Sequence, residues 1–480
     1  MTEVLAELLV VDRRDERRLS RSLTAQLRNL IAADRLASGS RLPSSREFAR
    51  ALGVSRNTVT AVFGQLSAEG YLAIQPGRRP VIAAGIGASS AISRGGEGGA
   101  SFQPAPASWA ASLGEAPPTG RTRPLHAGFG DVREFPHAEW ARCLRDAARR
   151  GADRSFAINA PALQAALRDH LQAQRGVRTA MERIVILPTA QAALTMMATI
   201  ALDPGDVAWL EEPGYPGIRR AVAATGAVVV AVPVDRHGLV PPTDPSRPRL
   251  IFTTPSHQFP TGSLMSVGRR RSLLQIARRS GALIVEDDYD GEYHFDGVPA
   301  PALQALDEAG TVAYVGTLSK ATTPAIRLGY IVAPESLLPT IHAVQRHWGL
   351  IAAPHVQEAL SLFIQRGHYL AHVRRTGRIY QARRDHLVSQ LRAHLAGVLA
   401  VAAPAGGLQL QASLLHRTDD AAIAAALARQ GIDLTPLSGF YAGEPASAGF
   451  LLGFASWREE EIDRAVARLR DAITRGPARP

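Results

Sequence analysis

Residues 84–124 constrain the fold most strongly, because they carry hardly any hydrophobic periodicity. Gly, Ala, Ser and Pro dominate this stretch, from a glycine-rich tether at 95–99 to a stiffer proline-containing piece at 104–106. A structureless segment of about 40 residues does not fit inside one compact domain. We therefore expect a first domain at residues 1–83, a flexible linker at 84–124 and a second domain at 125–480.

The composition excludes several classes of protein. Cys143 is the only cysteine, so no disulfide can form within the chain and a reducing compartment is expected. The sequence shows neither a basic, then apolar leader nor a run of about 20 apolar residues, so we expect a cytoplasmic protein with no membrane partner. No CxxC, HExxH or paired-histidine spacing indicates a metal site.

The first domain has the pattern of a helix-turn-helix. Apolar residues recur at helical spacing between residues 19 and 34. Ser44 and Glu47 predict a capping box that starts a second helix, Gly53 ends that helix, and Ser55 caps a third. Two short helices joined by a tight turn that contains glycine place the second helix in a DNA major groove.

The net charge of +11 favours an anionic partner. Between Arg17 and Arg79 there are 11 arginines and three acids, so this stretch of the first domain carries a surplus of +8. This charge favours binding of double-stranded DNA over the alternative, an ordinary three-helix bundle whose arginines only confer solubility. The third helix leaves Arg56, Asn57 and Thr60 off its apolar face, and all three are candidates for DNA contacts.

Lys320 is the only lysine among 54 lysines and arginines. Lysine differs from arginine in nucleophilic amine chemistry, since a lysine can lose its proton and form a Schiff base. It ends the motif Gly316-Thr317-Leu318-Ser319-Lys320, and Arg327 follows shortly after. An amine beside hydroxyls and a guanidinium suits a carbonyl cofactor that carries a phosphate, so Lys320 is the candidate catalytic residue of a pyridoxal 5'-phosphate (PLP) site. The alternative is an accidental lysine on a solvated face.

The second domain alternates short apolar runs with helical patterns, which predicts a largely parallel sheet covered by helices on both faces. The run at 282–285 predicts a buried strand, and the acids at 286–290 follow just past its end, where ligands bind in open α/β sheets. Asp287 is our candidate to pair with the protonated ring nitrogen of the cofactor. Asp290 and Glu292 fit a solvated acidic turn better.

A phosphate site is expected at the start of another helix. A strand at 184–187 runs into Pro188, and the helix opens directly afterwards. Backbone N–H groups at a helix start bind phosphate, so Thr189, Ala190 and Gln191 are candidate cofactor-binding residues.

Several separated motifs together resemble the MocR-type transcriptional regulators. In the second domain they are Thr254-Pro255-Ser256-His257-Gln258-Phe259-Pro260-Thr261-Gly262, the acids at 286–290, and the lysine motif with Pro324, Arg327, Leu328, Gly329 and Tyr330. In the first domain they are Leu42-Pro43-Ser44-Ser45-Arg46 and Leu52-Gly53-Val54-Ser55-Arg56-Asn57-Thr58-Val59. The resemblance implies a GntR-type winged helix-turn-helix, a fold-type I aminotransferase-like PLP domain with a small C-terminal α+β subdomain, and a homodimer.

The resemblance also implies roles for particular residues. Tyr215 would stack on the cofactor ring, while His257 and Tyr289 would lie near the ring hydroxyl. The residues that would hold the phosphate are Thr317, Ser319 and Arg327. Those that would reach DNA phosphates and base edges are Arg46, Ser55, Arg56 and Thr58.

The sequence departs from the family pattern at four places. Thr189 stands where a glycine is usual, and Arg78-Arg79 replaces a glycine-rich wing tip, where the two arginines are candidates to enter a minor groove. Leu451 stands where fold-type I aminotransferases carry the arginine that binds the substrate's α-carboxylate. Gln164 replaces the arginine of a Leu-Arg pair.

Three functions compete on this basis. The first is a PLP-dependent transcriptional regulator whose aminotransferase-like domain senses PLP or an amine effector and controls promoter binding. The second is a working aminotransferase with an accessory DNA-binding domain. The third is a structural role in which the lysine pocket only serves dimerisation. The motif order favours the first, and the missing arginine predicts little or no transaminase turnover.

Overall fold

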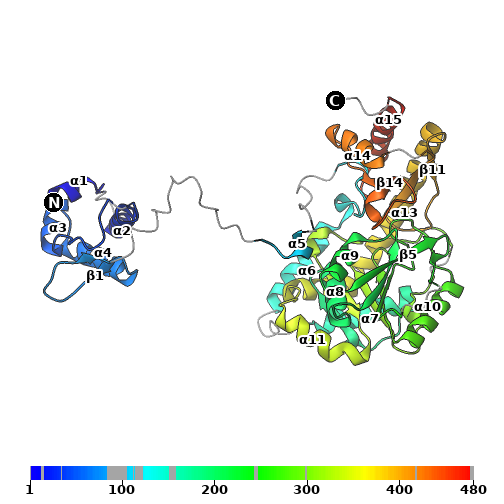
Figure 1. The fold of residues 1–480 in the computed structure, drawn as a ribbon, viewed down its shortest axis with the longest axis horizontal. Helices are drawn as coiled ribbons and strands as arrows, with labels where there is room; N and C mark the ends of the chain where they lie inside the picture. The colour runs from blue at the N-terminus through cyan, green and yellow to red at the C-terminus, as the bar shows by residue number, and fades with distance from the viewer. Residues whose placement is uncertain are drawn as a thin grey trace. The chain divides into compact units, whose positions relative to one another are not determined.

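The computed structural model describes residues 2–11, 16–33, 35–83, 105–111, 113, 123–150, 158–242, 247–297, 300–416 and 419–475. The chain forms two compact units that divide between Ala105 and Pro106 (Figure 1). Most of the expected linker lies outside the described residues, although a short helix, α5 (Ser108–Ala111), is described within it. No helix in the described ranges is long and apolar enough to cross a membrane.

Unit 1 is a small helical domain with a two-stranded hairpin. Its elements are α1 (Thr2–Glu7), α2 (Glu16–Ala32), α3 (Ser45–Leu52), α4 (Arg56–Ala68), β1 (Leu72–Ala73) and β2 (Val81–Ile82). The last five confirm the helices and the wing expected from the sequence. The sequence did not predict α1, because its six residues are too few for a periodic pattern; Leu5 anchors it in the core of the unit.

The predicted caps define the turn of the helix-turn-helix. The Ser44 backbone donates to Glu47 Oε2 at 2.9 Å and the Glu47 backbone donates to Ser44 Oγ at 3.3 Å, which completes the capping box. Gly53 ends α3 with φ 62°, a left-handed conformation that glycine adopts without a Cβ penalty. Ser55 then caps α4 by accepting from the Thr58 backbone at 3.0 Å.

Unit 2 is built on an eight-stranded sheet in the order β3-β10-β9-β8-β7-β4-β5-β6. The strands are β3 (Ile184–Leu187), β4 (Val207–Glu212), β5 (Val228–Asp235), β6 (Gly238–Leu239), β7 (Leu250–Thr253), β8 (Leu283–Asp288), β9 (Val312–Thr317) and β10 (Gly329–Val332). The antiparallel pairs are those of β10 with β3 and β9 and that of β6 with β5, and the other pairs are parallel. The largely parallel sheet is as predicted.

Helices cover both faces of this sheet, as Figure 1 shows. One face packs against α8 (Ala190–Ala201), α9 (Pro216–Ala223) and α11 (Leu338–His347). The other packs against α7 (Pro161–Arg175), α10 (Val267–Ser280) and α12 (Pro354–Gln365), with α6 (His137–Arg150) against α12. The long α13 (His368–Leu395) leads to the small subdomain, whose elements are β11 (Leu399–Val401), β12 (Gln409–Leu414), α14 (Asp420–Arg429), β13 (Thr435–Pro436), β14 (Gly449–Gly453) and α15 (Glu459–Arg475).

The structure corrects the expectation for the acidic segment after residue 285. Strand β8 continues to Asp288, so three of its acids are ladder residues instead of turn residues. Asp290 is not solvated either, since it is 3% exposed and pairs with His257. Glu292 pairs with His170 at 2.7 Å. The sequence suggested a solvated turn because the histidines that neutralise these acids lie far away in the chain.

Candidate functional site

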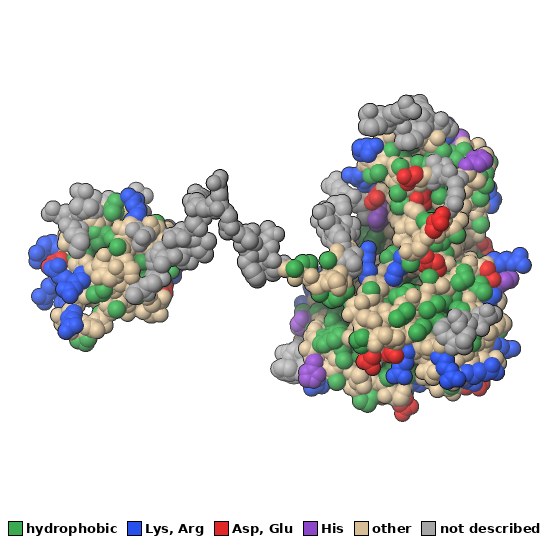
Figure 2. Space-filling model, viewed as in Figure 1, with side chains coloured by type: hydrophobic (Ala, Val, Ile, Leu, Met, Phe, Trp, Pro, Cys, Tyr) green, Lys and Arg blue, Asp and Glu red, His purple; other side chains and the backbone are tan. Residues whose placement is uncertain are grey.

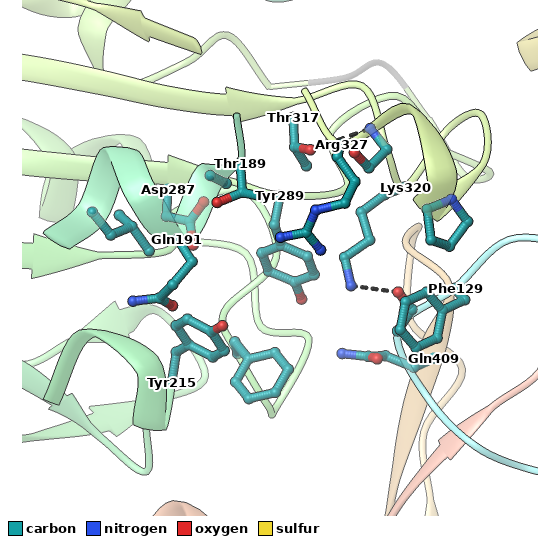
Figure 3. A pocket seen from close by; sticks show the side chains of 16 residues that line it. Phe129, Thr189, Gln191, Tyr215, Asp287, Tyr289, Thr317, Lys320, Arg327 and Gln409 are labelled. Carbon is teal, nitrogen blue, oxygen red and sulfur yellow. Dashed lines mark hydrogen bonds between the residues drawn. The ribbon is translucent and has the colours of Figure 1, made fainter. Parts of the chain in front are cut away.

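A cavity of about 410 Å³ lies at the carboxyl ends of the central strands of unit 2. This volume is within the range of small-molecule pockets, and the location is where open α/β sheets bind ligands. The candidate residues that line it are Thr189, Ala190, Gln191, Tyr215, Asp287, Tyr289, Thr317, Ser319, Lys320 and Arg327. The structure thus brings together every candidate cofactor residue except His257 (Figure 3).

Lys320 directs its amine into this cavity from the turn after β9. Its Nζ donates to the carbonyl oxygen of Gly128 and lies 4.9 Å from the centre of the Phe129 ring. A Cβ on Gly128 would lie 3.1 Å from this Nζ, so glycine there leaves room for the amine. Burial lowers the pKa of Lys320, and the carboxylates of Asp290 and Asp287 oppose that change. A lowered pKa increases the share of the neutral, nucleophilic amine.

Asp287 is a buried carboxylate whose partner is missing. Its Oδ1 accepts no hydrogen bond from any residue that the structure describes. Burial, reinforced by Asp288, raises its pKa to about 8. Both features fit a site where the carboxylate meets a ring N–H of a bound molecule, because an unpartnered buried carboxylate is otherwise expensive.

The two flanking acids of β8 already have partners. Glu286 accepts from the backbone N–H groups of Leu303 and Gln304 at 2.7 and 2.8 Å. Asp288 Oδ2 accepts hydrogen bonds from Arg175 Nε at 2.7 Å and from the Tyr314 hydroxyl at 2.6 Å. Successive residues of a strand point to opposite faces, so these two acids point away from the cavity that Asp287 enters. This alternation explains why only one of the three is available to a ligand.

The start of α8 gives another part of the cavity the features of a phosphate site. Thr189 caps α8 by accepting from the Ala192 backbone at 3.0 Å, and the first turn of this helix borders the cavity. Gly329 packs so closely that a Cβ there would lie 2.5 Å from the Ala190 backbone nitrogen. Arg327 lies beside it in a left-handed conformation with φ 47°, which costs a non-glycine residue about 1–2 kcal/mol and holds its guanidinium in the cavity.

Two hydroxyl residues of the lysine motif, Thr317 and Ser319, also line the cavity. Thr317 Oγ1 donates to the Leu328 carbonyl at 3.1 Å and accepts from the Ser319 backbone at 3.2 Å. Because the Thr317 proton is donated to Leu328, Ser319 is the one of the two whose hydroxyl proton is left for an anion.

Aromatic rings form other parts of the cavity wall. Phe259 contacts Tyr215 and Tyr289 edge to face, with ring centroids 5.6 and 5.8 Å apart. Figure 3 shows Tyr215 and Phe129 on opposite sides of the space that Lys320 and Arg327 enter. A flat, phosphorylated heterocycle fits such a slot, with its ring between aromatic walls.

His257 lies behind the cavity and does not line it. Its Nδ1 is 2.8 Å from Asp290 Oδ1, and this carboxylate raises the pKa of the histidine although burial opposes the rise. Gly406 and Gly407 pack on the pair, since a Cβ on either would clash with His257 or Asp290. The described partner of His257 is therefore Asp290, and its place near the ring hydroxyl of the cofactor stays a prediction.

The sequence analysis missed several lining residues: Gly128, Phe129, Leu194, Phe259, Pro324 and Gln409. Phe259 and Pro324 belong to the quoted motifs, so the sequence carried a signal for them. Gln409 carries none, because it reaches the cavity from β12 of the small subdomain. Its Oε1 is buried and without a hydrogen-bond partner among the described residues.

The candidate DNA-binding residues lie on the exposed side of α3, α4 and the hairpin. Arg46, Arg56 and Asn57 are exposed, and Figure 2 shows basic side chains gathered on the surface of unit 1. Ser55 and Thr58 form the cap of α4, with their hydroxyl oxygens 2.7 Å apart. The Thr60 hydroxyl donates to the Arg56 carbonyl at 2.9 Å.

The two wing arginines differ in their surroundings. Arg79 Nη2 lies 2.7 Å from Glu47 Oε1, so it ties the wing to α3. Arg78 Nη1 donates to Gln75 at 3.2 Å within the turn. Arg78 is therefore better placed than Arg79 to enter a DNA minor groove. Arg79 would first have to break its ion pair with Glu47.

Two family models match the chain. Residues 128–469 match the aminotransferase class I and II family, and residues 19–82 match the bacterial regulatory proteins of the gntR family. An archaeal alanine:glyoxylate aminotransferase has a TM-score of 0.70 and 26% identity over 74% of this chain and 91% of that chain. LysN, the α-aminoadipate aminotransferase of Thermus thermophilus complexed with N-(5'-phosphopyridoxyl)-L-leucine, has a TM-score of 0.66 and 25% identity over 74% and 92%. Fold and site together define unit 2 as an aminotransferase-type PLP domain.

Relatives of full length share both units. The chain is 37% identical to the probable rhizopine catabolism regulatory protein MocR of Rhizobium meliloti, over 97% of this chain and 96% of that protein. It is 32% identical to the HTH-type transcriptional regulator TauR of Rhodobacter capsulatus, over 94% and 96%. The chain belongs to the MocR-type regulators, in which a gntR-family DNA-binding domain precedes an aminotransferase class I and II domain. Its cofactor is PLP.

Proposed function

We propose that this protein is a PLP-dependent transcriptional regulator in which unit 2 senses an amine, or PLP itself, and thereby controls promoter binding by unit 1. The observation that carries the proposal is the presence in one chain of a gntR-type helix-turn-helix and of a pocket built around the only lysine. A chain that only catalysed transamination would need no DNA-binding unit.

The pocket residues divide the work of holding the cofactor. Lys320 supplies the amine, and Asp287 accepts the ring N–H with the oxygen that is otherwise unpartnered. The phosphate lies against the start of α8, where Arg327 supplies the counter-charge. Tyr215 and Phe259 confine the ring. Bound there, PLP supplies an aldehyde carbon that condenses reversibly with primary amines.

Regulation follows from a difference in affinity. An effector can shift the protein between DNA-competent and incompetent states only if it binds the two states unequally. We propose that the chain acts as a homodimer in the cytoplasm and that the segment between the units conveys the occupancy of the pocket to the winged helices. Two helix-turn-helix units then bind two half-sites of one promoter.

A second candidate function is catalysis of transamination. It is favoured by the fold, because solved aminotransferases cover 74% of this chain at up to 26% identity. Leu451 argues against efficient turnover, since it is an apolar residue on β14 at the position where we expect the carboxylate-binding arginine of such enzymes. Orientation of the reacting carbon is a major source of rate, and this strand provides no cation for it.

The test of the proposed function uses the full-length protein and DNA from the region upstream of its own gene. Fluorescence anisotropy measures the affinity for this DNA with PLP bound, with PLP removed, and with a panel of primary amines added. We expect salt-dependent binding whose affinity changes at least several-fold between these states. Binding that is identical in all states, or absent at low salt, contradicts the proposal.

A further inference from the structure

Each charged side chain that lines the pocket has a role in holding the cofactor. Among the residues that the structure describes, the charged side chains lining it are Asp287, Lys320 and Arg327. Each is committed to the ring nitrogen, the aldehyde carbon or the phosphate in the proposed function, on which this inference rests. The rest of the lining is neutral, consisting of aromatic, aliphatic, hydroxyl and amide groups. An effector therefore meets no free cation in this lining.

An apolar wall packs behind the pocket residue Phe259, and Leu451 belongs to this wall without itself lining the pocket. Leu451 lies in the middle of β14, opposite Gln411 of β12, and is 2% exposed. It clusters with Leu437 and Phe440, and the pocket residue Phe259 packs against this cluster. A carboxylate brought against this wall would lose its water and gain no countercharge.

Three guanidiniums of neighbouring segments are held by other groups. Arg219 Nη2 donates to the Phe440 carbonyl at 2.7 Å. Arg133 and Arg383 both bind the buried Asp131, at 2.8 and 3.0 Å. None of these three guanidiniums lines the pocket. Moving one toward a ligand would break an existing bond to a buried group, which is costly.

Gln409 offers a buried polar atom without a partner in the part of the lining that comes from the small subdomain. Its Oε1 is buried and has no hydrogen-bond partner among the described residues, while a hydrogen bond from its side chain to Tyr289 acts to lower the pKa of that phenol. A Cβ on Gly128 would lie 3.7 Å from this oxygen and 3.1 Å from Lys320 Nζ, so both atoms lie close to Gly128. A free carbonyl oxygen accepts a hydrogen bond from N–H or O–H and repels an anion.

We propose that the effector of this pocket is a primary amine whose other groups are uncharged, either aliphatic or hydroxylated, and that α-amino acids are rejected. Leu451 is the residue that excludes a carboxylate, and Gln409 is the residue that accepts a hydrogen bond from a hydroxyl of the effector. The effector class is thus set by the described residues of the pocket lining, which include no cation beyond those that hold the cofactor.

The experiment compares matched pairs that differ only in an α-carboxylate. Isothermal titration calorimetry on the PLP-loaded full-length protein measures the affinities of 2-aminoethanol against serine, propylamine against 2-aminobutyrate, and isoamylamine against leucine. We expect the amine of at least one pair to bind at least about tenfold more tightly than its amino acid. Equal or tighter binding of the amino acids overturns the inference, and so does the absence of binding by all three amines.

Two substitutions assign the preference to residues. Leu451→Arg is expected to make each amino acid bind more tightly than its matched amine. The volume-conserving Leu451→Met is expected to leave the amine the tighter binder. Gln409→Leu is expected to weaken the binding of 2-aminoethanol several-fold more than the binding of propylamine. If Leu451→Arg loses its cofactor absorbance, the wild-type pairs still decide the inference. DNA affinity that responds neither to PLP nor to any amine defeats the proposed function, while the preference for uncharged amines can still hold.

Discussion

Replacing Asp287 by asparagine has opposite effects on the cofactor-free and the cofactor-loaded protein. Without cofactor, burial raises the pKa of this carboxyl from its ordinary 3.8 to about 8. The stability it contributes is therefore present below pH 4 and is lost as the pH rises through about 8. Each pH unit of such a change is worth about 1.4 kcal/mol, so the ionised carboxylate costs the fold several kcal/mol at pH 9. Rearrangement and water entry reduce this cost, and we expect Asp287→Asn to stabilise the cofactor-free protein by about 1–3 kcal/mol at pH 9 and by less than about 1 kcal/mol at pH 5.

With PLP bound, the same substitution removes the acceptor of the ring N–H. Loss of one partner of a buried, charge-assisted hydrogen bond costs about 2–5 kcal/mol, so the affinity for PLP falls by roughly 30-fold or more. A substitution that merely disturbed packing would weaken both forms at every pH. The change of sign between the two forms is thus the signature of an unpartnered carboxylate.

Urea unfolding followed by tryptophan fluorescence measures the effect. All five tryptophans lie beyond residue 105, so the signal reports unit 2 alone in the full-length chain. Asp169→Asn is the matched control, because this aspartate side chain is 68% exposed and the exchange should leave the pH profile unchanged. The reasoning is refuted if the difference between wild type and Asp287→Asn is the same at pH 5 and pH 9, or if PLP affinity is unaltered.

Three further predictions concern the lysine, the DNA contacts and turnover. Lys320→Ala leaves a chain without lysine, so borohydride should no longer fix PLP to any peptide; a variant that retains fixed cofactor contradicts the assignment. Arg56→Ala should weaken promoter binding by about 1–3 kcal/mol and Arg79→Ala by less, because Glu47 already engages Arg79; anisotropy titrations at several salt concentrations compare them. Steady-state assays with amino donors and keto acids should give turnover well below about 1 per second, and faster turnover promotes the enzyme function.

The sequence predicted those parts of the fold and site that short stretches encode. The capping box of Ser44 and Glu47 and the end of α3 at Gly53 follow from local backbone chemistry, and the structure has both. Lys320, Asp287 and Thr189 follow apolar runs closely, so their place at the ends of parallel strands was predictable. Each of these inferences needed only a short run of neighbouring residues.

The remaining features depend on partners that are distant in the chain. Gln409 and Phe129 enter the pocket from segments far from Lys320, and no local pattern marks them. Hydrophobic periodicity ends β8 too early, because it treats the acids after Val285 as surface residues. Hydrophobic periodicity contains no information about Arg175, which neutralises Asp288 from 113 positions away in the chain. Charge neutralisation over such separations is visible only after folding.

The partners of the acids in β8 also identify what the pocket lacks. A strand in the centre of a sheet can bury consecutive carboxylates only if each has a donor, since the desolvation of one unpaired charge costs several kcal/mol. Glu286 accepts from two backbone N–H groups at the start of η4 (Gln304–Leu306). Asp288 leaves its Oδ1 without a partner, but its Oδ2 receives Arg175 and the Tyr314 hydroxyl, so its charge is neutralised.

Asp287 differs from both neighbours, because no cation or hydroxyl within the described residues donates to its buried Oδ1 and it is the acid that lines the cavity. Lys320 lowers the pKa of this carboxyl only through charge, and burial outweighs that effect. The missing donor must therefore come from a bound molecule, and a protonated ring nitrogen satisfies both the hydrogen bond and the charge.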